Sequence, residues 1–382
     1  MDTFSPSVDV DLGNLLHNLR QIRMNLSPAT GIIAVVKDCA YGCGATVVSR
    51  ILESDGNVAC FAVARTAEAR VLRENGIKGT LIVLGKADDD ELRQGHAADI
   101  TFTCNDLDDI HRWNRSGLPV RFHCNIDTGM RRLGIQPGEL PDLITLLQST
   151  AQLQCTGIFT HMASADVPGT GSVYRQYELF RSVLAGLKTH GMLPQFIHCA
   201  NSATIIRFPV AECTHVRPGI ALYGCRPDPR QDFGIDLRPV LTLKGTVVSL
   251  RPVPSSTPVG YGGNYVTTTA TTIATISAGY AHGIPRYLSN RGEVLIKGQR
   301  YRIAGNVTMD YIMVDAGPNP QFSIGEEAVI IGSQGDEHIF PDDVAIIGNT
   351  TGYEVLCNIG TSIPRNYTMN GIVVESVPGR TF

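Results

Sequence analysis

Eight short apolar runs dominate the first 235 residues of the chain, and they constrain its fold more than any other feature. They occupy residues 31–37, 60–64, 80–85, 99–104, 120–127, 154–162, 196–201 and 215–224. Most are separated by segments with helical periodicity, such as 177–191. Strands that alternate with helices predict a parallel sheet, and eight such units are the number that closes a (β/α)8 barrel. We therefore expect an α/β protein whose first domain, residues 1–235, is a (β/α)8 barrel.

The pattern changes after Pro239 to long alternating strands with Gly- and Pro-rich turns, at 241–250, 267–277, 293–305 and 326–333. Helical periodicity nearly disappears there. The segment 226–239 is rich in Pro, Asp and Arg, which is typical of a domain boundary. The sequence therefore predicts a second, all-β domain over residues 236–382.

Composition excludes several classes of function. The chain has 32 Lys+Arg against 36 Asp+Glu, so no basic excess favours nucleic acid or an anionic membrane. Its acidic start does not resemble a signal peptide, and no stretch reaches the roughly 18 apolar residues of a membrane span. The ten cysteines are scattered without a CxxC pair, so we expect reduced core thiols and no metal site. These features predict a soluble, cytoplasmic protein that acts on a small, weakly charged substrate.

Active sites of such barrels lie where the strands end, and two lysines follow strands. Lys37 comes directly after an apolar run, where an amine is partly desolvated and more nucleophilic toward an aldehyde. Lys86 leads into an acidic stretch and is interpreted as a solvated ion-pair partner. The position alone leaves open whether Lys37 forms a Schiff base or is an ordinary lysine.

The other strand ends carry further polar residues, in the segments 127–132, 161–166, 201–202 and 217–219. Singly, an arginine in a surface ion pair, a histidine in the core or a serine that caps a helix explains each of them. Together, a lysine, several arginines, an imidazole and a Ser/Gly-rich loop describe a pocket for a phosphorylated aldehyde cofactor.

Eight segments resemble, in the right order, the signature motifs of the alanine racemase family. They are AVVKDCAYGCGA, IDTGMRRLGI, GIFTHMASAD, HCANSAT, VRPGIALYG, VGYGGNY, ISAGYAHGIPR and AGNVTMDYIMVDAG. The resemblance extends from about residue 7 to 368. It implies a pyridoxal phosphate (PLP) enzyme of fold type III that interconverts L- and D-alanine. It also implies a homodimer in which the β domain of one subunit completes the active site of the other.

The resemblance further implies two bases on opposite faces of the substrate. Lys37 matches the lysine that binds PLP covalently, and Tyr280 matches the tyrosine contributed by the other subunit. One base removes the α-proton and the other returns a proton from the opposite side.

Other positions match the family's cofactor and substrate contacts. His161 matches the residue packed against the cofactor ring, and Arg217 the arginine that faces the pyridine nitrogen. Arg132 matches the arginine near the cofactor phenolate and the substrate carboxylate. The phosphate positions are matched by Tyr41, Ser202, Gly219 and Ile220. The loop that receives the substrate carboxylate is matched by Met309 and Asp310.

Several positions depart from the common family pattern. Asn125 replaces a lysine that is often carbamylated, so we expect an anion such as chloride between Asn125 and Arg132. Thr361 stands beside the substrate in place of a tyrosine, and Asn306 replaces an arginine of the substrate channel. The preferred substrate therefore stays open between alanine, serine and a broader set. Three further departures are Cys39, Cys43 and His282.

Two alternatives to a racemase remain at this stage. A decarboxylase of the same fold type places a cysteine opposite the lysine, where this chain has Tyr280. A non-catalytic PLP-binding protein keeps the lysine and the phosphate loop but has no need of a β domain.

Overall fold

The structure is a computed structural model that describes residues 4–169, 171–208 and 212–379. The chain forms two compact units. The barrel unit comprises Leu19–Ala40 and Ala45–Leu222, and the sheet unit comprises the residues up to Asn18, Tyr41–Gly44 and the residues from Tyr223 onward. Each is described by itself.

The barrel unit is built on eight parallel strands in the order β8-β7-β6-β5-β4-β3-β2-β9. Their bounds are β2 (Gly31–Val35), β3 (Cys60–Val63), β4 (Thr80–Val83), β5 (Ile100–Cys104), β6 (Val120–Asn125), β7 (Leu153–Phe159), β8 (Phe196–His198) and β9 (His215–Val216). The ends of this sheet meet, because Thr214 N–H donates to the Ile197 carbonyl and Arg217 N–H to that of Ala200. The predicted barrel is confirmed, and each of the eight runs contains one strand. The last run is mostly not a strand, since Ile220–Tyr223 forms the 3-10 helix η2.

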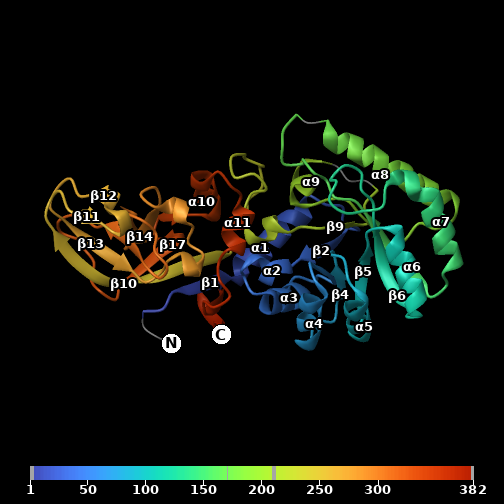
Figure 1. The fold of residues 1–382 in the computed structure, drawn as a ribbon, viewed down its shortest axis with the longest axis horizontal. Helices are drawn as coiled ribbons and strands as arrows, with labels where there is room; N and C mark the ends of the chain where they lie inside the picture. Colours follow the sequence, from blue (N-terminus) through green and yellow to red (C-terminus); the bar gives the residue numbers. More distant parts are fainter. Residues whose placement is uncertain (1–3, 170, 209–211, 380–382) are drawn as a thin grey trace. The chain divides into compact units, whose positions relative to one another are not determined.

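Helices connect the barrel strands and lie around their outer side (Figure 1). After α1 (Leu12–Met24) and the turn α2 (Lys37–Tyr41), they are α3 (Ala45–Ser54), α4 (Thr66–Glu74), α5 (Asp89–Ala97), α6 (Leu107–Ser116), η1 (Pro137–Glu139), α7 (Leu140–Ser149), α8 (Ser172–Thr189) and α9 (Ser202–Arg207). Local sequence sets their ends: Asp88 caps α5 by accepting the Glu91 N–H, and Gly117 ends α6 at φ 70°. Trp113 of α6 is fully buried between the rings of Phe102 and Phe122. These contacts bury the inner face of the helix against strands β5 and β6.

The sheet unit contains a ten-stranded sheet whose main path is β15-β14-β17-β10-β1-β19-β20. Its strands are β1 (Ser7–Asp11), β10 (Leu241–Val253), β13 (Thr271–Ile276), β14 (Glu293–Ile296), β15 (Gln299–Arg302), β16 (Ile312–Asp315), β17 (Glu327–Gln334), β18 (Glu337–Ile339), β19 (Arg365–Met369) and β20 (Ile372–Val377). A small hairpin joins β11 (Pro258–Val259) and β12 (Tyr265–Val266). Burial alternates along the first half of β10, which is why its residues read as a strand with one buried face.

The strand-rich C-terminal part is confirmed, with two corrections. It is not all-β, because it contains α10 (Pro341–Gly348) and α11 (Gly352–Cys357) and the short 3-10 helices η3 (Tyr261–Gly263), η4 (Tyr280–His282) and η5 (Arg286–Leu288). Pro341 opens α10, where its missing N–H is harmless, and Asn349 ends it at φ 51°. The second concerns the N-terminal strand β1. The sequence analysis placed it with the barrel in residues 1–235, but it pairs with β10 and β19 of the sheet unit.

The ten cysteines are free thiols, most of them buried. Two pairs lie close together in the barrel unit, with Sγ–Sγ distances of 3.2 Å for Cys199 and Cys213 and 3.6 Å for Cys124 and Cys155. None of the described helices has the length and hydropathy needed to cross a membrane.

Candidate active site

Lys37 stands at the end of β2, where the chain enters a left-handed turn. Residues 38–41 all have φ between 52° and 57°, which costs roughly 1–2 kcal/mol for each residue that is not glycine. Glu68 of α4 supports this turn, because its carboxylate accepts the N–H groups of Asp38 at 2.6 Å and of Ala64 at 2.8 Å. The Lys37 side chain is 39% exposed, and its Nζ lies 3.5 Å from the Asp38 carboxylate. Backbone strain of this kind is typical of functional sites.

Arg217 follows β9 and is buried with its guanidinium bound to neutral acceptors. Nη1 donates to the His198 Nδ1 at 2.6 Å and to the His198 carbonyl at 2.8 Å. Nη2 donates to the Thr160 carbonyl at 2.8 Å and lies 3.4 Å from the His161 Nδ1. Burial lowers the pKa of Arg217 to about 10, so it remains a cation at neutral pH. Within the described part of the chain, Nε–H is the one position of this guanidinium without an acceptor.

The partners of Arg217 fix the tautomers of two buried histidines. An arginine only donates, so the His198 Nδ1 carries no proton and its Nε2–H donates to the His123 Nδ1 at 2.9 Å. The proton of His123 must then lie on Nε2, which is buried without a partner among the described residues. Burial lowers the pKa of His123 to about 3, and burial with the Arg217 charge lowers the pKa of His198 well below its usual value. Both rings are therefore neutral.

His161 follows β7, and three cations of this rim affect its pKa. Burial is the largest cause that lowers its pKa to about 3, and the charges of Arg217, Arg132 and Lys37 lower it further. The ring is neutral, and because its Nδ1 faces Arg217, its proton lies on Nε2. Gln176 of α8 holds the backbone nearby, since its Nε2 donates to the His161 carbonyl at 3.0 Å.

Arg132 is exposed on the loop that follows β6, in which Asp127 is buried. Burial raises the pKa of Asp127, but N–H donation from Arg131 and Gly129, each at 3.0 Å, outweighs it and lowers the pKa. Asp127 is therefore a structural carboxylate that shapes the loop.

The expectation of an anion between Asn125 and Arg132 is not supported on the Asn125 side. The two amide hydrogens of Asn125 donate to the Asn105 Oδ1 at 2.9 Å and to the Leu133 carbonyl at 3.1 Å. Asn125 consequently has no donor left for an anion.

Ser202, Gly219 and Ile220 come together where β8 and β9 end. The Ser202 Oγ accepts the N–H groups of Gly219 at 3.0 Å and Ala221 at 3.3 Å. Ser202 does not cap α9, because that role falls to Asn201, whose Oδ1 accepts the Thr204 N–H at 3.0 Å. Ile220 is fully buried at the start of η2. This loop and the turn after Lys37 share the same barrel face, because strand ends of a parallel barrel meet at one rim.

The remaining predicted residues belong to the sheet unit. Tyr41 is 5% exposed, and its ring lies 4.8 Å from that of Tyr223, centroid to centroid. Tyr280 opens η4 and is 43% exposed, held by donation of its N–H to the Thr308 carbonyl at 2.9 Å. The adjacent Ala281 N–H donates to the Met309 carbonyl at 3.0 Å, so Tyr280 and Met309 lie on neighbouring segments.

Asp310 and Thr361 are also exposed in the sheet unit. Burial lowers the pKa of His282 below its usual value. The charge of the nearby Asp310 raises this pKa, but by less than burial lowers it. The His282 Nδ1 accepts the Gly279 N–H at 3.2 Å. A departure noted from sequence, His282, thus contributes to the turn that carries Tyr280.

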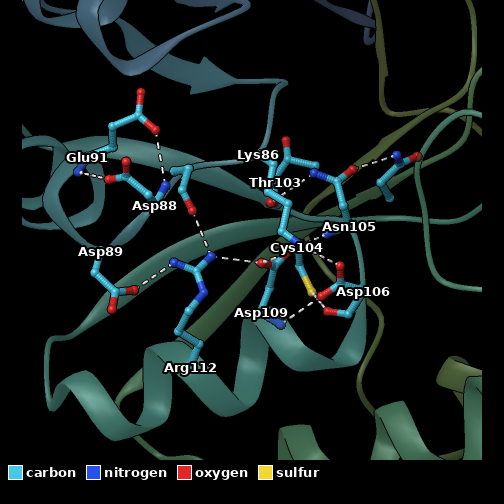
Figure 2. Close-up of polar contacts among 12 residues, drawn as sticks. Lys86, Asp88, Asp89, Glu91, Thr103, Cys104, Asn105, Asp106, Asp109 and Arg112 are labelled. Atoms are coloured by element: carbon cyan, nitrogen blue, oxygen red, sulfur yellow. Dashed lines mark hydrogen bonds and ion pairs between the residues drawn. The ribbon is translucent and has the colours of Figure 1, made fainter.

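Lys86 has the structural role expected of it, although its partners differ from its sequence neighbours. It pairs with Asp106 at 2.5 Å and with Asp109 at 3.7 Å, both after β5 (Figure 2). The acidic residues that follow it in sequence belong to the capped start of α5.

Sequence reasoning missed the residues behind the rim. His123 lies inside β6 rather than at its end, and His198 is the last residue of β8, three residues before the polar segment 201–202 that the sequence analysis considered. A histidine within an apolar strand is the signal that marks them, because its polar ring needs a partner in the core.

Known proteins resemble this chain along nearly its whole length. Models for the N-terminal and C-terminal domains of alanine racemase match residues 10–227 and 240–367. The alanine racemase of Halothermothrix orenii is 37% identical over 94% of this chain and 96% of its own length. Alanine racemase 2 of Bacillus subtilis is 37% identical over 96% of both chains.

Solved structures agree with these relatives. The alanine racemase of Bacillus anthracis with bound L-Ala-P superposes with a TM-score of 0.92 at 34% identity, covering 98% of both chains. That of Clostridium difficile superposes with a TM-score of 0.91 at 32% identity, with 98% of both chains covered. The fold and these relatives thus define an enzyme of the racemase class of isomerases. Within that class, the chain belongs to the alanine racemase family.

Proposed function

We propose that this protein interconverts L- and D-alanine with pyridoxal phosphate bound at the rim of the barrel unit. Two bases move the proton, Lys37 and Tyr280 of the partner subunit. The observation that carries this proposal is the charge pattern at His161, because Lys37, Arg132 and Arg217 all act on one buried, neutral imidazole.

The donors of the rim fit pyridoxal phosphate. The unused Nε–H of Arg217 suits an acceptor such as an unprotonated pyridine nitrogen, and His161 supplies a neutral ring beside it. In the loop of Ser202, Gly219 and Ile220 the Gly219 N–H already donates to the Ser202 Oγ, so the Ser202 hydroxyl, which keeps its own hydrogen, is the donor that would hold a phosphate oxygen. When bound, the cofactor supplies an aldehyde carbon for an amine and a ring that withdraws electrons from the substrate Cα.

Arg217 would set how strongly the cofactor ring withdraws electrons. It remains a cation with a pKa of about 10, and the acceptors on its Nη atoms fix its plane. Its Nε–H would therefore donate a hydrogen bond to a facing pyridine nitrogen and keep that nitrogen unprotonated, which would favour proton return over slower side reactions.

The two bases hold the proton in turn. The Nζ of Lys37 accepts it on one face of Cα, and the hydroxyl of Tyr280 accepts or returns it on the other. Arg132 and the loop of Met309 and Asp310 would orient the substrate carboxylate, so that the Cα–H points at one of these bases.

An exposed apolar cluster supports a homodimer with shared sites. Tyr280, Met309 and Tyr311 of the sheet unit are 43%, 54% and 47% exposed. Large apolar side chains gathered in this way mark an interaction surface, and a twofold dimer covers the same surface on both subunits. We propose that residues 236–382 of each subunit complete the site on residues 1–235 of its partner, and that the protein acts in the cytoplasm.

The direct test supplies the purified protein with pyridoxal phosphate and L-alanine in D2O. We expect D-alanine to appear with deuterium at Cα. Cofactor binding without exchange at Cα would favour the non-catalytic alternative.

A second candidate function, racemisation of serine, rests on the exposed Thr361, whose hydroxyl is a hydrogen-bond partner for a serine side chain. A higher kcat/KM for serine than for alanine would favour it.

A further inference from the structure

The loop Asp127–Ile135 is held on both sides of Arg132. On the N-terminal side, the Asp127 carboxylate accepts the Arg131 N–H at 3.0 Å. On the C-terminal side, the Leu133 carbonyl accepts the Asn125 amide at 3.1 Å. Arg132 is thus the residue between two side-chain clamps. Among the described residues, no hydrogen bond or ion pair engages its guanidinium.

Local backbone geometry brings Asn125 and the loop into contact. The Ile135 N–H donates to the Asn125 carbonyl at 2.8 Å, and the Asp127 N–H donates to the Ile135 carbonyl at 3.0 Å. Gly134 has φ 129°, and a Cβ there would lie 2.8 Å from the Asp127 nitrogen and 3.2 Å from the Asn125 side chain. Only glycine allows so close a crossing. The loop therefore closes directly over the Asn125 side chain.

Asn125 is itself anchored through a buried polar chain. It donates to Asn105, whose N–H donates to the Asp109 Oδ2 at 3.0 Å. The other oxygen of Asp109 accepts from the Arg112 Nη2 at 2.9 Å, and Figure 2 shows Arg112 between Asp109 and Asp89. Asn105 and Asp109 are 3% and 1% exposed, so the hydrogen bonds between Asn125, Asn105 and Asp109 are shielded from water. It ties the end of β6 to the start of α6.

We propose that Asn125 is a positioning residue that fixes Arg132 through the Leu133 carbonyl, with Asn105 and Asp109 as its anchor. This inference rests on the proposed function, because it takes Arg132 as the group that orients the substrate carboxylate. Both amide hydrogens of Asn125 are used within the protein, so this role needs no contact between Asn125 and the reacting atoms. Its effect falls on substrate binding, because a loosened loop must be ordered again whenever a carboxylate binds.

The test compares Asn125→Ala and Asn125→Asp with the wild-type holoenzyme. Asn125→Ala removes both donors. Asn125→Asp keeps the size of the side chain but turns oxygens toward the Leu133 carbonyl and the Asn105 Oδ1, so it guards against a variant that fails to fold. We expect both variants to raise the KM for L-alanine roughly five- to twentyfold while kcat stays within about twofold. Asn18→Ala is the matched control, because Asn18 is also a buried amide that donates to a backbone carbonyl, that of Arg238.

A second readout is independent of catalysis. Hydrogen–deuterium exchange of the peptide 127–135 should be faster in both variants, with and without the cofactor, and unchanged in Asn18→Ala. Unchanged exchange together with an unchanged KM would overturn the inference. An equal loss of kcat in both variants at wild-type KM would also overturn it. A wild-type protein that does not racemise alanine would refute the proposed function instead. Hydrogen–deuterium exchange of the peptide 127–135 would still show whether Asn125 holds the loop through the Leu133 carbonyl.

Discussion

Acid should destabilise this protein through its buried neutral histidines, and His123 offers the clearest case. Its pKa is about 3 in the folded protein, against about 6.5 in an unfolded chain. Between these values the unfolded chain binds a proton that the folded protein does not, so stability falls as the pH drops below about 6.5. The loss is complete near pH 3, where the folded ring also takes up its proton.

The magnitude follows from the unfolded pKa. At pH 4.5 the unfolded imidazole gains about 2.7 kcal/mol from binding its proton, and the folded ring gains almost nothing because its pKa lies well below 4.5. A variant without this imidazole avoids that penalty. We therefore expect His123→Gln to lose about 2–3 kcal/mol less unfolding free energy than the wild type between pH 8 and pH 4.5.

Equilibrium unfolding in urea at both pH values measures this difference. The chain has one tryptophan, and Trp113 is fully buried in the barrel unit, so its fluorescence reports the transition. Protein concentration and cofactor load are kept equal across samples. The control is His190→Gln, because His190 is exposed. The reasoning is refuted if His123→Gln loses as much stability at pH 4.5 as the wild type and the control.

Three further predictions concern catalysis. Lys37→Ala should abolish both activity and the visible absorbance of the bound cofactor, whereas Lys86→Ala should affect neither, because Lys86 only pairs with Asp106 and Asp109; bleaching by Lys86→Ala would contradict the assignment. Tyr280→Phe should lose Cα deuterium exchange mainly from one enantiomer, as followed by NMR, and equal losses from both would argue against two opposed bases. Thr361→Tyr should lower the serine-to-alanine ratio of kcat/KM by about tens of fold, a difference of roughly 1–3 kcal/mol, and an unchanged ratio would defeat that reasoning.

The barrel was predictable because its strands are buried on both sides and read as continuous apolar runs. The helix signals between them are equally local, as at the Asp88 cap of α5. The helix α10 was missed because it has only eight residues, too few to show a period, although Pro341 and Asn349 mark its ends. Strand β1 was missed because its partners β10 and β19 lie more than 200 residues away in sequence.

In the candidate site, too, local sequence signals were predictable and contacts between distant residues were not. Strand-end positions and motif order identified Lys37, His161 and Arg217, since a parallel barrel gathers strand ends on one rim. Hydrogen bonds across the barrel were not predictable, because they depend on which side chains of distant strands face each other. The His198–His123 pair and the use of both Asn125 donors belong to this group. The left-handed turn at residues 38–41 has no sequence signal either, since Cys39 and Ala40 do not favour that conformation.

The central claim is that each active site draws one base from each of two subunits. Inactive Lys37→Ala and Tyr280→Ala proteins, mixed under conditions that exchange subunits, measure this most directly. Each mixed dimer carries one site with Lys37 and the partner's Tyr280 intact, so we expect racemisation of L-alanine to return, up to about a quarter of wild-type activity when half of the dimers are mixed. No recovery despite subunit exchange proven by mass spectrometry would contradict the claim and place both bases within one chain.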